Sequence, residues 1–166
     1  MIIVITDACF LIDLIDIDLF EEFLGLGYQV HITSSVFAEL EGDEYVKPVS
    51  KNIEHKKMFI YNMTAADQTA LEKLMGKHSS RLSEPDCSCL YLAKEMKATI
   101  LTCEKLLTDV TKSLNLDVHG SLWILDRLLE ASMITRRIAY SKLKDLMSIN
   151  PRLPITECQK RLKRWS

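Results

Sequence analysis

Four acidic residues lie next to apolar segments of the sequence, where a fold could bring them together. They are Asp7, Glu39, Asp86 and Glu104. Clustered carboxylates repel one another, so a protein tolerates them only when a cation lies between them. Oxygen ligands suit the hard divalent ions Mg²⁺ and Mn²⁺. The natural chemistry of such a site is hydrolysis of a phosphodiester bond, in which the metal activates water and neutralises the phosphate.

Each of these acids also has a purely structural interpretation. Asp86 follows Ser83 by three residues and could complete a capping box, which the local pattern supports as well as it supports metal ligation. Glu39 could be an ordinary solvated helix residue, and Glu104 could interact with the positive end of its helix. Asp7 is harder to explain in this way, because an acid that directly follows a buried strand needs a partner.

The elements that must position these acids alternate between strands and helices. Apolar and β-branched runs predict strands at 1–6, 28–33, 57–63, 98–102 and 116–119. Helical spacing of apolar residues predicts helices at 9–25, 36–41, 64–75, 83–96, 104–114, 121–131, 136–149 and 155–165. We expect residues 43–56, which include Pro48, to be irregular or weakly helical, and residues 77–82 to form a loop. The alternation predicts an α/β fold, a three-layer α/β/α sandwich with a central parallel sheet.

The composition is typical of one soluble globular domain that spans residues 1–166. Apolar residues make up 48% and charged residues 27%, and the apolar runs are too short to cross a membrane. We recognise no signal peptide. Residues 1–46 hold ten acidic and no basic residues, whereas residues 136–166 hold nine Lys or Arg and two acidic residues. This asymmetry indicates an acidic site and a separate basic surface, although two solvated helix faces explain the charges more simply.

Other kinds of catalytic site find little support. The five cysteines have irregular spacing, so we expect reduced, mostly buried thiols in a cytoplasmic protein. The four histidines share no metal-ligand spacing and are assigned no role. The sequence has neither a Gly-x-Ser-x-Gly motif nor a glycine-rich phosphate loop. Asp13 and Glu84 are interpreted as surface charges.

The chain resembles the PIN-domain family of metal-dependent ribonucleases, which includes VapC-like toxins. Four segments carry the resemblance: IVITDACFLIDL (3–14), SSVFAELEG (34–42), LSEPDCSCLYLAKEMKATILTCEKLLTDV (82–110) and LDVHGSLWIL (116–125). The resemblance implies a carboxylate-held Mg²⁺ or Mn²⁺ at the rim of the sheet and cleavage of single-stranded or exposed RNA. Asp7, Glu39 and Asp86 match the first three acidic positions of the family.

Two positions depart from the family pattern. Family members often carry Ser or Thr after the first acid, where this chain has Ala8; Thr6 is a poor substitute if it faces the other side of its strand. The family usually offers Asp or Asn after the segment TILT, where Cys103 and Glu104 stand here. Glu104 could serve with its longer side chain, whereas Asp109 lies about 140° further around the helix. The implied metal ligands are Asp7, Asp86 and Glu104, and Glu39 joins them as a catalytic residue.

The basic segment 136–166 is expected to be a helical extension of the domain. Near its end, Lys160, Arg161, Lys163 and Arg164 could contact RNA phosphates while Trp165 stacks on a base. The alternative is a packed, solvated terminal helix whose cations complement its dipole.

These features predict a Mg²⁺- or Mn²⁺-dependent endoribonuclease, and the toxin of a toxin–antitoxin pair is one form of it. The alternatives are a PIN-like domain that binds RNA or protein without cleaving, and a nuclease that acts on structured DNA. RNA is the expected partner. An antitoxin protein and a second copy of the chain are further candidates, and a membrane is not.

Overall fold

The structure, a computed structural model, describes residues 1–78 and 81–166. Five strands in these residues form one parallel sheet in the order β3-β2-β1-β4-β5. They are β1 (Ile3–Thr6), β2 (Gln29–Thr33), β3 (Met58–Tyr61), β4 (Thr99–Leu101) and β5 (Val118–His119). Val4, Ile5, Val30 and Ile100 are completely buried, because helices cover both faces of a parallel sheet.

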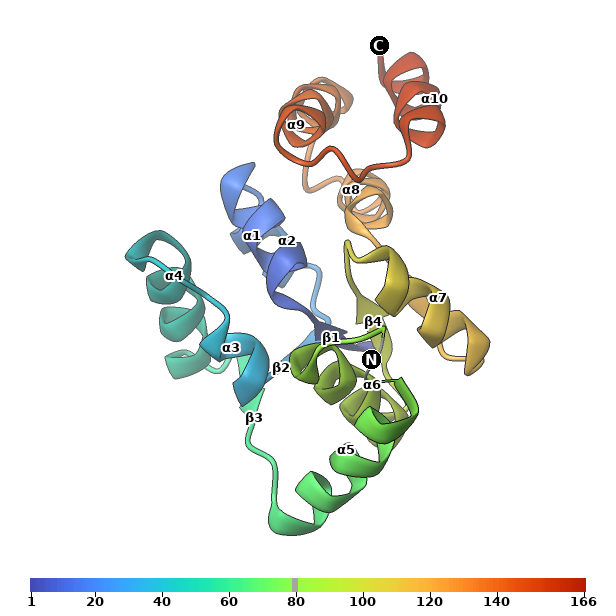
Figure 1. Ribbon diagram of the computed structural model, residues 1–166. Coiled ribbons are helices and arrows are strands. Elements are labelled where there is room, and N and C mark those ends of the chain that lie inside the picture. The colour runs from blue at the N-terminus through green and yellow to red at the C-terminus, as the bar shows by residue number, and fades with distance from the viewer. Residues whose placement is uncertain (79–80) are drawn as a thin grey trace.

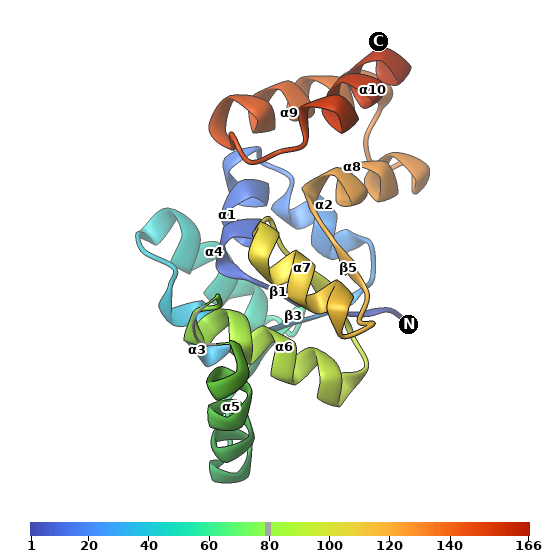
Figure 2. The same ribbon diagram turned by 45° about the vertical axis from the view of Figure 1, so that its right-hand side comes forward.

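The helices form the two outer layers. They are α1 (Ala8–Asp16), α2 (Phe20–Gly25), α3 (Ser34–Ala38), α4 (Asp43–Glu54), α5 (Ala65–His78), α6 (Glu84–Met96), α7 (Lys105–Ser113), α8 (Ser121–Glu130), α9 (Arg136–Ile149) and α10 (Ile155–Trp165). Helices α1, α2 and α8 pack together on one side of the sheet, and α6 packs across β1, β2 and β4 on the other (Figure 1). The pair α9 and α10 lies outside α1 and α8, while α5 projects away from the sheet (Figure 2). The predicted three-layer α/β/α sandwich is confirmed.

The strand order reverses direction between β1 and β4. From β1 the chain winds outward through β2 to β3, and it then returns to build β4 and β5 on the other side of β1. Ligands of open parallel sheets bind beyond the carboxyl ends of the strands at such a point. Thr6 pairs with Leu101 in the sheet, and the backbone N–H of Asp7 donates to the Leu101 carbonyl at 3.2 Å. The first acid of the sequence therefore lies at this reversal.

Two helices near the site differ from their predicted bounds. The single helix predicted at 9–25 is two helices, α1 and α2, because the chain turns at Asp18 with a left-handed φ of 58°. The helix predicted at 36–41 begins earlier, as α3, because Thr33 caps it by accepting a bond from the Val36 N–H at 3.2 Å. Glu39 is consequently the C-cap residue of α3 and does not lie in the interior of the predicted helix.

Two further segments are more helical than predicted. Residues 43–54 form α4 despite Pro48, because burial of Val49 and Asn52 stabilises the helix, and the Asn52 side chain donates to the Pro48 carbonyl at 2.9 Å. Helix α5 continues past Gly76 to His78. The loop predicted at 77–82 falls partly on residues 79–80, which lie outside the described residues.

The cysteines agree with the expectation of reduced, mostly buried thiols. All five cysteines are free, and Cys87, Cys89 and Cys158 are buried. Within 1–78 and 81–166, no helix is both long enough and apolar enough to cross a membrane.

Candidate metal centre

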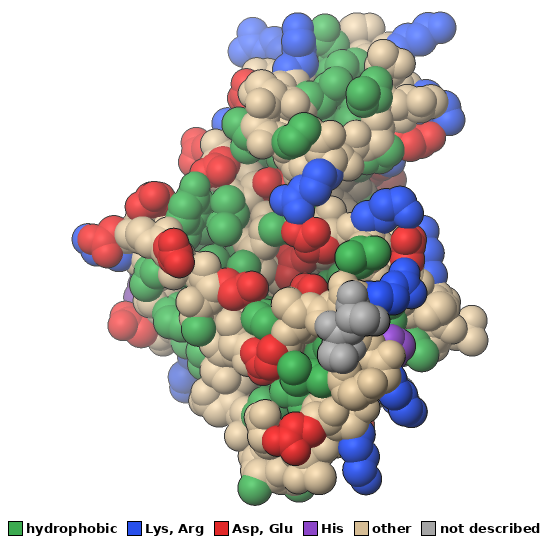
Figure 3. Space-filling model, viewed as in Figure 1, with side chains coloured by type: hydrophobic (Ala, Val, Ile, Leu, Met, Phe, Trp, Pro, Cys, Tyr) green, Lys and Arg blue, Asp and Glu red, His purple; other side chains and the backbone are tan. Residues whose placement is uncertain are grey.

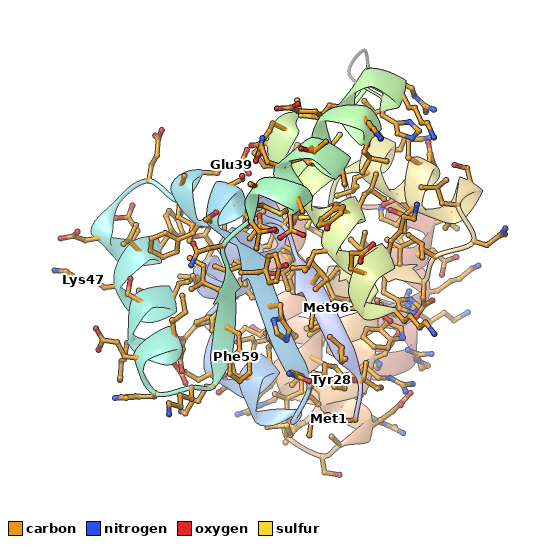
Figure 4. The ribbon with its side chains drawn as sticks, turned by 90° about the horizontal axis from the view of Figure 1, so that it is seen from below. Met1, Tyr28, Glu39, Lys47, Phe59 and Met96 are labelled. Atoms are coloured by element: carbon orange, nitrogen blue, oxygen red, sulfur yellow. The ribbon has the colours of Figure 1, made fainter. Side chains whose placement is uncertain are left out.

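All four predicted acids line one pocket at the carboxyl edge of the sheet. The pocket has a volume of about 280 Å³, and Asp7, Glu39, Asp86 and Glu104 share its wall with Ala8, Cys9, Ile12 and Ser83. Figure 3 shows acidic side chains gathered around a hollow in the middle of this face. Figure 4 shows Glu39 at one edge of the sheet, with Met1 and Tyr28 at the opposite edge where the strands begin. The carboxylates come from four separate segments of the chain.

Asp7 is the most deeply buried acid of the pocket. It is only 4% exposed, caps α1 by accepting a bond from the Phe10 N–H at 2.9 Å, and accepts a second bond from the Thr102 hydroxyl. Burial raises the pKa of Asp7 to about 7 against the opposing effect of these two bonds, and repulsion from Asp86 and Glu104 raises it further. The surroundings of Asp7 therefore disfavour its charged form near neutral pH.

Thr102 is a residue that sequence reasoning missed. Its hydroxyl donates to Asp7 and accepts a bond from the Glu104 N–H at 2.9 Å, so it orients one acid and fixes the backbone of another. From its position directly after β4, it supplies the hydroxyl that Ala8 lacks. Thr6 cannot do so, because its side chain is completely buried and has no hydrogen-bond partner among the described residues. The contact arises from the parallel pairing of β1 with β4, which brings Thr102 beside Asp7 and which no local sequence pattern records.

Glu39 faces the pocket from the end of α3. It is exposed, as expected of a solvated residue. Its pKa is raised, first by partial desolvation and then by repulsion from Asp86, Glu84 and Glu104. Two bonds between α6 and the segment that carries Glu39 hold these elements together. The Thr33 and Ser88 hydroxyls lie 2.7 Å apart, and the Ser35 hydroxyl donates to Glu84 at 2.8 Å.

Asp86 forms the predicted capping box. Its Oδ2 accepts a bond from the Ser83 N–H at 3.2 Å, and the Ser83 hydroxyl accepts one from the Asp86 N–H at 3.3 Å. This structural role does not remove Asp86 from the site, because the residue also lines the pocket. The capping box instead fixes the direction in which its carboxylate points.

Glu104 is ion-paired with a residue from the C-terminal part of the chain. It precedes α7 without capping that helix, and its Oε1 contacts Nη1 of Arg152. The neighbouring Lys105 pairs with Asp109 at 2.9 Å and does not line the carboxylate pocket. Arg152 thus neutralises one acid of the site, whereas Asp109 belongs to a separate surface pair.

The interpretation of Asp13 as a surface charge is wrong. Asp13 is 8% exposed, and its Oδ2 accepts bonds from the Cys103 thiol at 3.0 Å and from Asn150 Nδ2 at 2.7 Å. Asn150 in turn accepts a bond from the Arg152 N–H at 3.0 Å. This chain of contacts fixes the segment that carries Arg152, and its members are too far apart in sequence for a local pattern to reveal it. Glu84, the other predicted surface charge, is half-buried.

Most of the predicted RNA-binding cations on α10 form ion pairs within the protein. Arg161 and Arg164 both bind the Asp126 carboxylate of α8 at 2.7 Å, and Lys160 binds Glu157 at 2.9 Å. The fourth residue, Lys163, is exposed. The prediction that Trp165 stacks on a base is wrong, because its side chain is only 4% exposed and therefore buried in the protein. The helix is amphipathic, and its last turn packs inward.

The donor set fits Mg²⁺ or Mn²⁺ in chemistry but is not assembled around an ion. All four groups are carboxylates that share one pocket, as these cations require. In the described residues, no three His, Cys, Asp or Glu side chains are placed to hold one metal ion. Asp7, Asp86 and Glu104 each bind a partner within the protein. A bound cation would therefore share or compete for the Glu104 carboxylate with Arg152.

Comparison with known proteins identifies the family of the chain. A family model described as PIN domain matches residues 3–166. The chain belongs to the PIN-domain family. Its fold is similar to that of a chain in the crystal structure of VapBC2 from Rickettsia felis bound to a DNA fragment from their promoter. The TM-score is 0.53 at 16% identity, and the match covers 72% of this chain and 98% of that one. No curated protein matches the chain.

Proposed function

We propose that this PIN domain is a Mg²⁺- or Mn²⁺-dependent endoribonuclease that hydrolyses phosphodiester bonds of RNA in the cytoplasm. The observation that carries the proposal is the convergence of Asp7, Glu39, Asp86 and Glu104 on one pocket at the reversal of the sheet. The raised pKa values of Asp7 and Glu39 support it, because they indicate negative charge that a cation would relieve.

The residues of the pocket have distinct proposed roles. Asp7, Asp86 and Glu104 would hold the metal, and Thr102 would keep the Asp7 carboxylate in position. When bound, the metal supplies activation of water and neutralisation of the phosphate. Glu39, whose pKa is raised and whose side chain is exposed to the pocket, would orient the attacking water and accept its proton.

Metal titration tests this function directly. We expect the wild-type chain to bind Mn²⁺ in calorimetric titration and to cleave single-stranded RNA, with cleavage lost in a chelator. Asp7→Asn should weaken Mn²⁺ binding by at least about tenfold and abolish cleavage. Asp43→Asn makes the same change at an exposed position of α4, where Asp43 pairs with Lys47, and should match the wild type. Wild-type rates in the Asp7 variant would refute the metal site.

A non-cleaving RNA- or protein-binding domain is the second candidate function. The observation that favours it is the Glu104–Arg152 ion pair, which already satisfies one acid without a metal. A chain that folds normally and binds RNA, yet shows no heat of Mn²⁺ binding, would support this candidate over the nuclease. Cleavage of structured DNA in preference to RNA would instead change the substrate but keep the metal site.

We also propose that a small antitoxin protein controls the activity. The proposal draws on the similar fold of VapBC2 from Rickettsia felis, together with the acidic pocket that an inhibitor could cover. A neighbouring reading frame for a small protein, whose product co-purifies with this chain and suppresses its toxicity on co-expression, would support it. A second copy of the chain is a further proposed partner, and sedimentation would reveal it.

A further inference from the structure

A second and larger hollow adjoins the carboxylate pocket. It has a volume of about 650 Å³ and lies between α7, β5 and the start of α8 on one side and the segment joining α9 to α10 on the other. We call it the C-terminal groove. Thr102 and Cys103, which directly follow β4, contribute to its wall, while Thr102 also contacts Asp7 in the carboxylate pocket. The two hollows are therefore neighbours at one edge of the sheet.

The C-terminal groove has the opposite charge to the carboxylate pocket. Lys105, Lys112, Arg152 and Arg161 line it against one acid, Glu157. Asp109 holds Lys105, and Asp126 holds Arg161. Lys112 is exposed, and no ion pair involves it in the part of the chain that the structure describes. Figure 3 shows basic side chains over α7 and the C-terminal helices, next to the acidic hollow. Such a surface attracts an anionic ligand.

The walls of the C-terminal groove also offer flat apolar surface. The His119 ring stacks on Trp123 with centroids 4.2 Å apart and an angle of 6° between the rings. Leu122, Leu153 and Pro154 line the same hollow. Cations around an aromatic and aliphatic surface are what proteins use to hold a single strand, with phosphates on the cations and bases against the rings.

Arg152 stands where the two hollows meet. Its guanidinium pairs with Glu104 of the carboxylate pocket, while the residue also lines the C-terminal groove. The contacts of Asn150 with Asp13 and with the Arg152 N–H fix this position. Because its guanidinium has donors besides the Nη1 that contacts Glu104, Arg152 can also bind a phosphate at the junction in the absence of metal.

We propose that the C-terminal groove binds the single-stranded RNA segment next to the scissile phosphate, with a base against His119 and phosphates on Lys112 and Arg152. This inference rests on the proposed nuclease function, which supplies RNA as the ligand. The charge complementarity and the continuity with the carboxylate pocket favour RNA over a protein segment. The C-terminal extension therefore helps to build the substrate site.

Binding measured without metal separates this inference from catalysis. The probe is a short fluorescein-labelled single-stranded RNA, titrated with the full chain in a chelator over a range of salt concentrations. Lys112→Gln should weaken RNA binding about threefold. It should also make the plot of log affinity against log salt concentration shallower by about 0.7. His119→Ala should weaken binding without changing the slope. Lys51→Gln, an exposed lysine on α4 at the far edge of the sheet, is the matched control and should behave as wild type.

The outcomes distinguish the groove from the nuclease. Groove-dependent binding in a chain that never cleaves would keep this inference and refute the proposed function. If the chain cleaves RNA with Mn²⁺ but neither Lys112→Gln nor His119→Ala changes its RNA affinity, the proposed function stands and this inference is refuted. RNA affinity could instead be unchanged in both variants while a short acidic peptide binds the wild type more tightly than Lys112→Gln. The groove would then hold a protein segment, and the inference would be wrong.

Discussion

Asp7 combines two roles at the scale of single residues. Its side chain caps α1, which is a structural role, and it carries a buried charge that no cation contacts directly in residues 1–78 and 81–166. The bonds from Thr102 and from the Phe10 N–H reduce the cost of this charge but do not cancel it, because the pKa stays raised. The apo protein should consequently be less stable than one in which this side chain is neutral.

We therefore predict that Asp7→Asn stabilises the metal-free protein in a pH-dependent way. Between about pH 4 and pH 7 the folded state holds a proton that the unfolded state has released, so the wild-type stability falls as pH rises. Asn has no such proton. In a chelator, the free energy of unfolding of the variant should be close to that of the wild type near pH 4. Above pH 7 it should exceed the wild-type value by at most about 4 kcal/mol.

Chemical denaturation across this pH range checks the prediction. Asp43→Asn is the control, since that side chain is exposed on α4. A constant difference between Asp7→Asn and wild type at all pH values would show that the carboxyl of Asp7 titrates normally.

At the scale of elements, α10 is tied to α8 through one carboxylate. Asp126 binds Nη2 of Arg161 at 2.7 Å, and Nη2 of Arg164 contacts its other oxygen at 2.7 Å. The Arg161–Asp126 pair is largely buried, with side chains 18% and 17% exposed. These contacts dock the helix, and they also reduce the charge that α10 can offer to RNA.

Asp126→Asn tests whether the cations of α10 contribute to RNA binding. The substitution removes the charge that holds Arg161 and Arg164 while changing little volume, although Arg161 still pairs with Glu157 at 3.4 Å. If α10 lies beside the bound strand, affinity for single-stranded RNA should rise about threefold and the salt slope should steepen. Glu54→Gln, a similar charge change on α4, serves as the control. Unchanged affinity would leave these cations with a docking role only, and Lys160 and Lys163 would then need separate tests.

At the scale of the whole molecule, the C-terminal helices belong to the same hydrophobic core as the sheet. Ala139, Leu143, Leu146 and Cys158 are completely buried, and α9 packs against both α1 and α8. The buried contact between Asn150 and Asp13 adds a polar link between the C-terminal extension and α1. Removal of the C-terminal extension would expose this apolar surface.

We predict that the chain unfolds as one cooperative unit. Trp123→Phe leaves Trp165 as the only tryptophan, so its fluorescence reports on α10, while far-ultraviolet circular dichroism reports on all helices. The two denaturation curves should coincide, as they do for a single domain. A fluorescence transition at lower denaturant would instead show that α10 detaches before the sheet unfolds, and the prediction of one domain over 1–166 would fail.

The sequence determined the elements and the identity of the acids, because both depend on local pattern. Apolar runs marked the strands, and an acid just beyond such a run lies at the carboxyl edge of a parallel sheet wherever the strands pair. Asp7 and Glu104 could therefore be placed together, and the capping box at Asp86 could be read from its spacing to Ser83. Helix ends were less predictable, since a threonine cap and a left-handed residue moved them.

Only the tertiary structure decided which groups complete the site. Thr102 meets Asp7 across 95 positions of sequence, Arg152 meets Glu104 across 48, and Asn150 meets Asp13 across 137. No local pattern records such pairs, because they depend on strand order and on where the C-terminal helices dock. The same docking buries Trp165 and opens the C-terminal groove beside the acids. Composition could show that the chain has an acidic and a basic region, but only packing places them side by side.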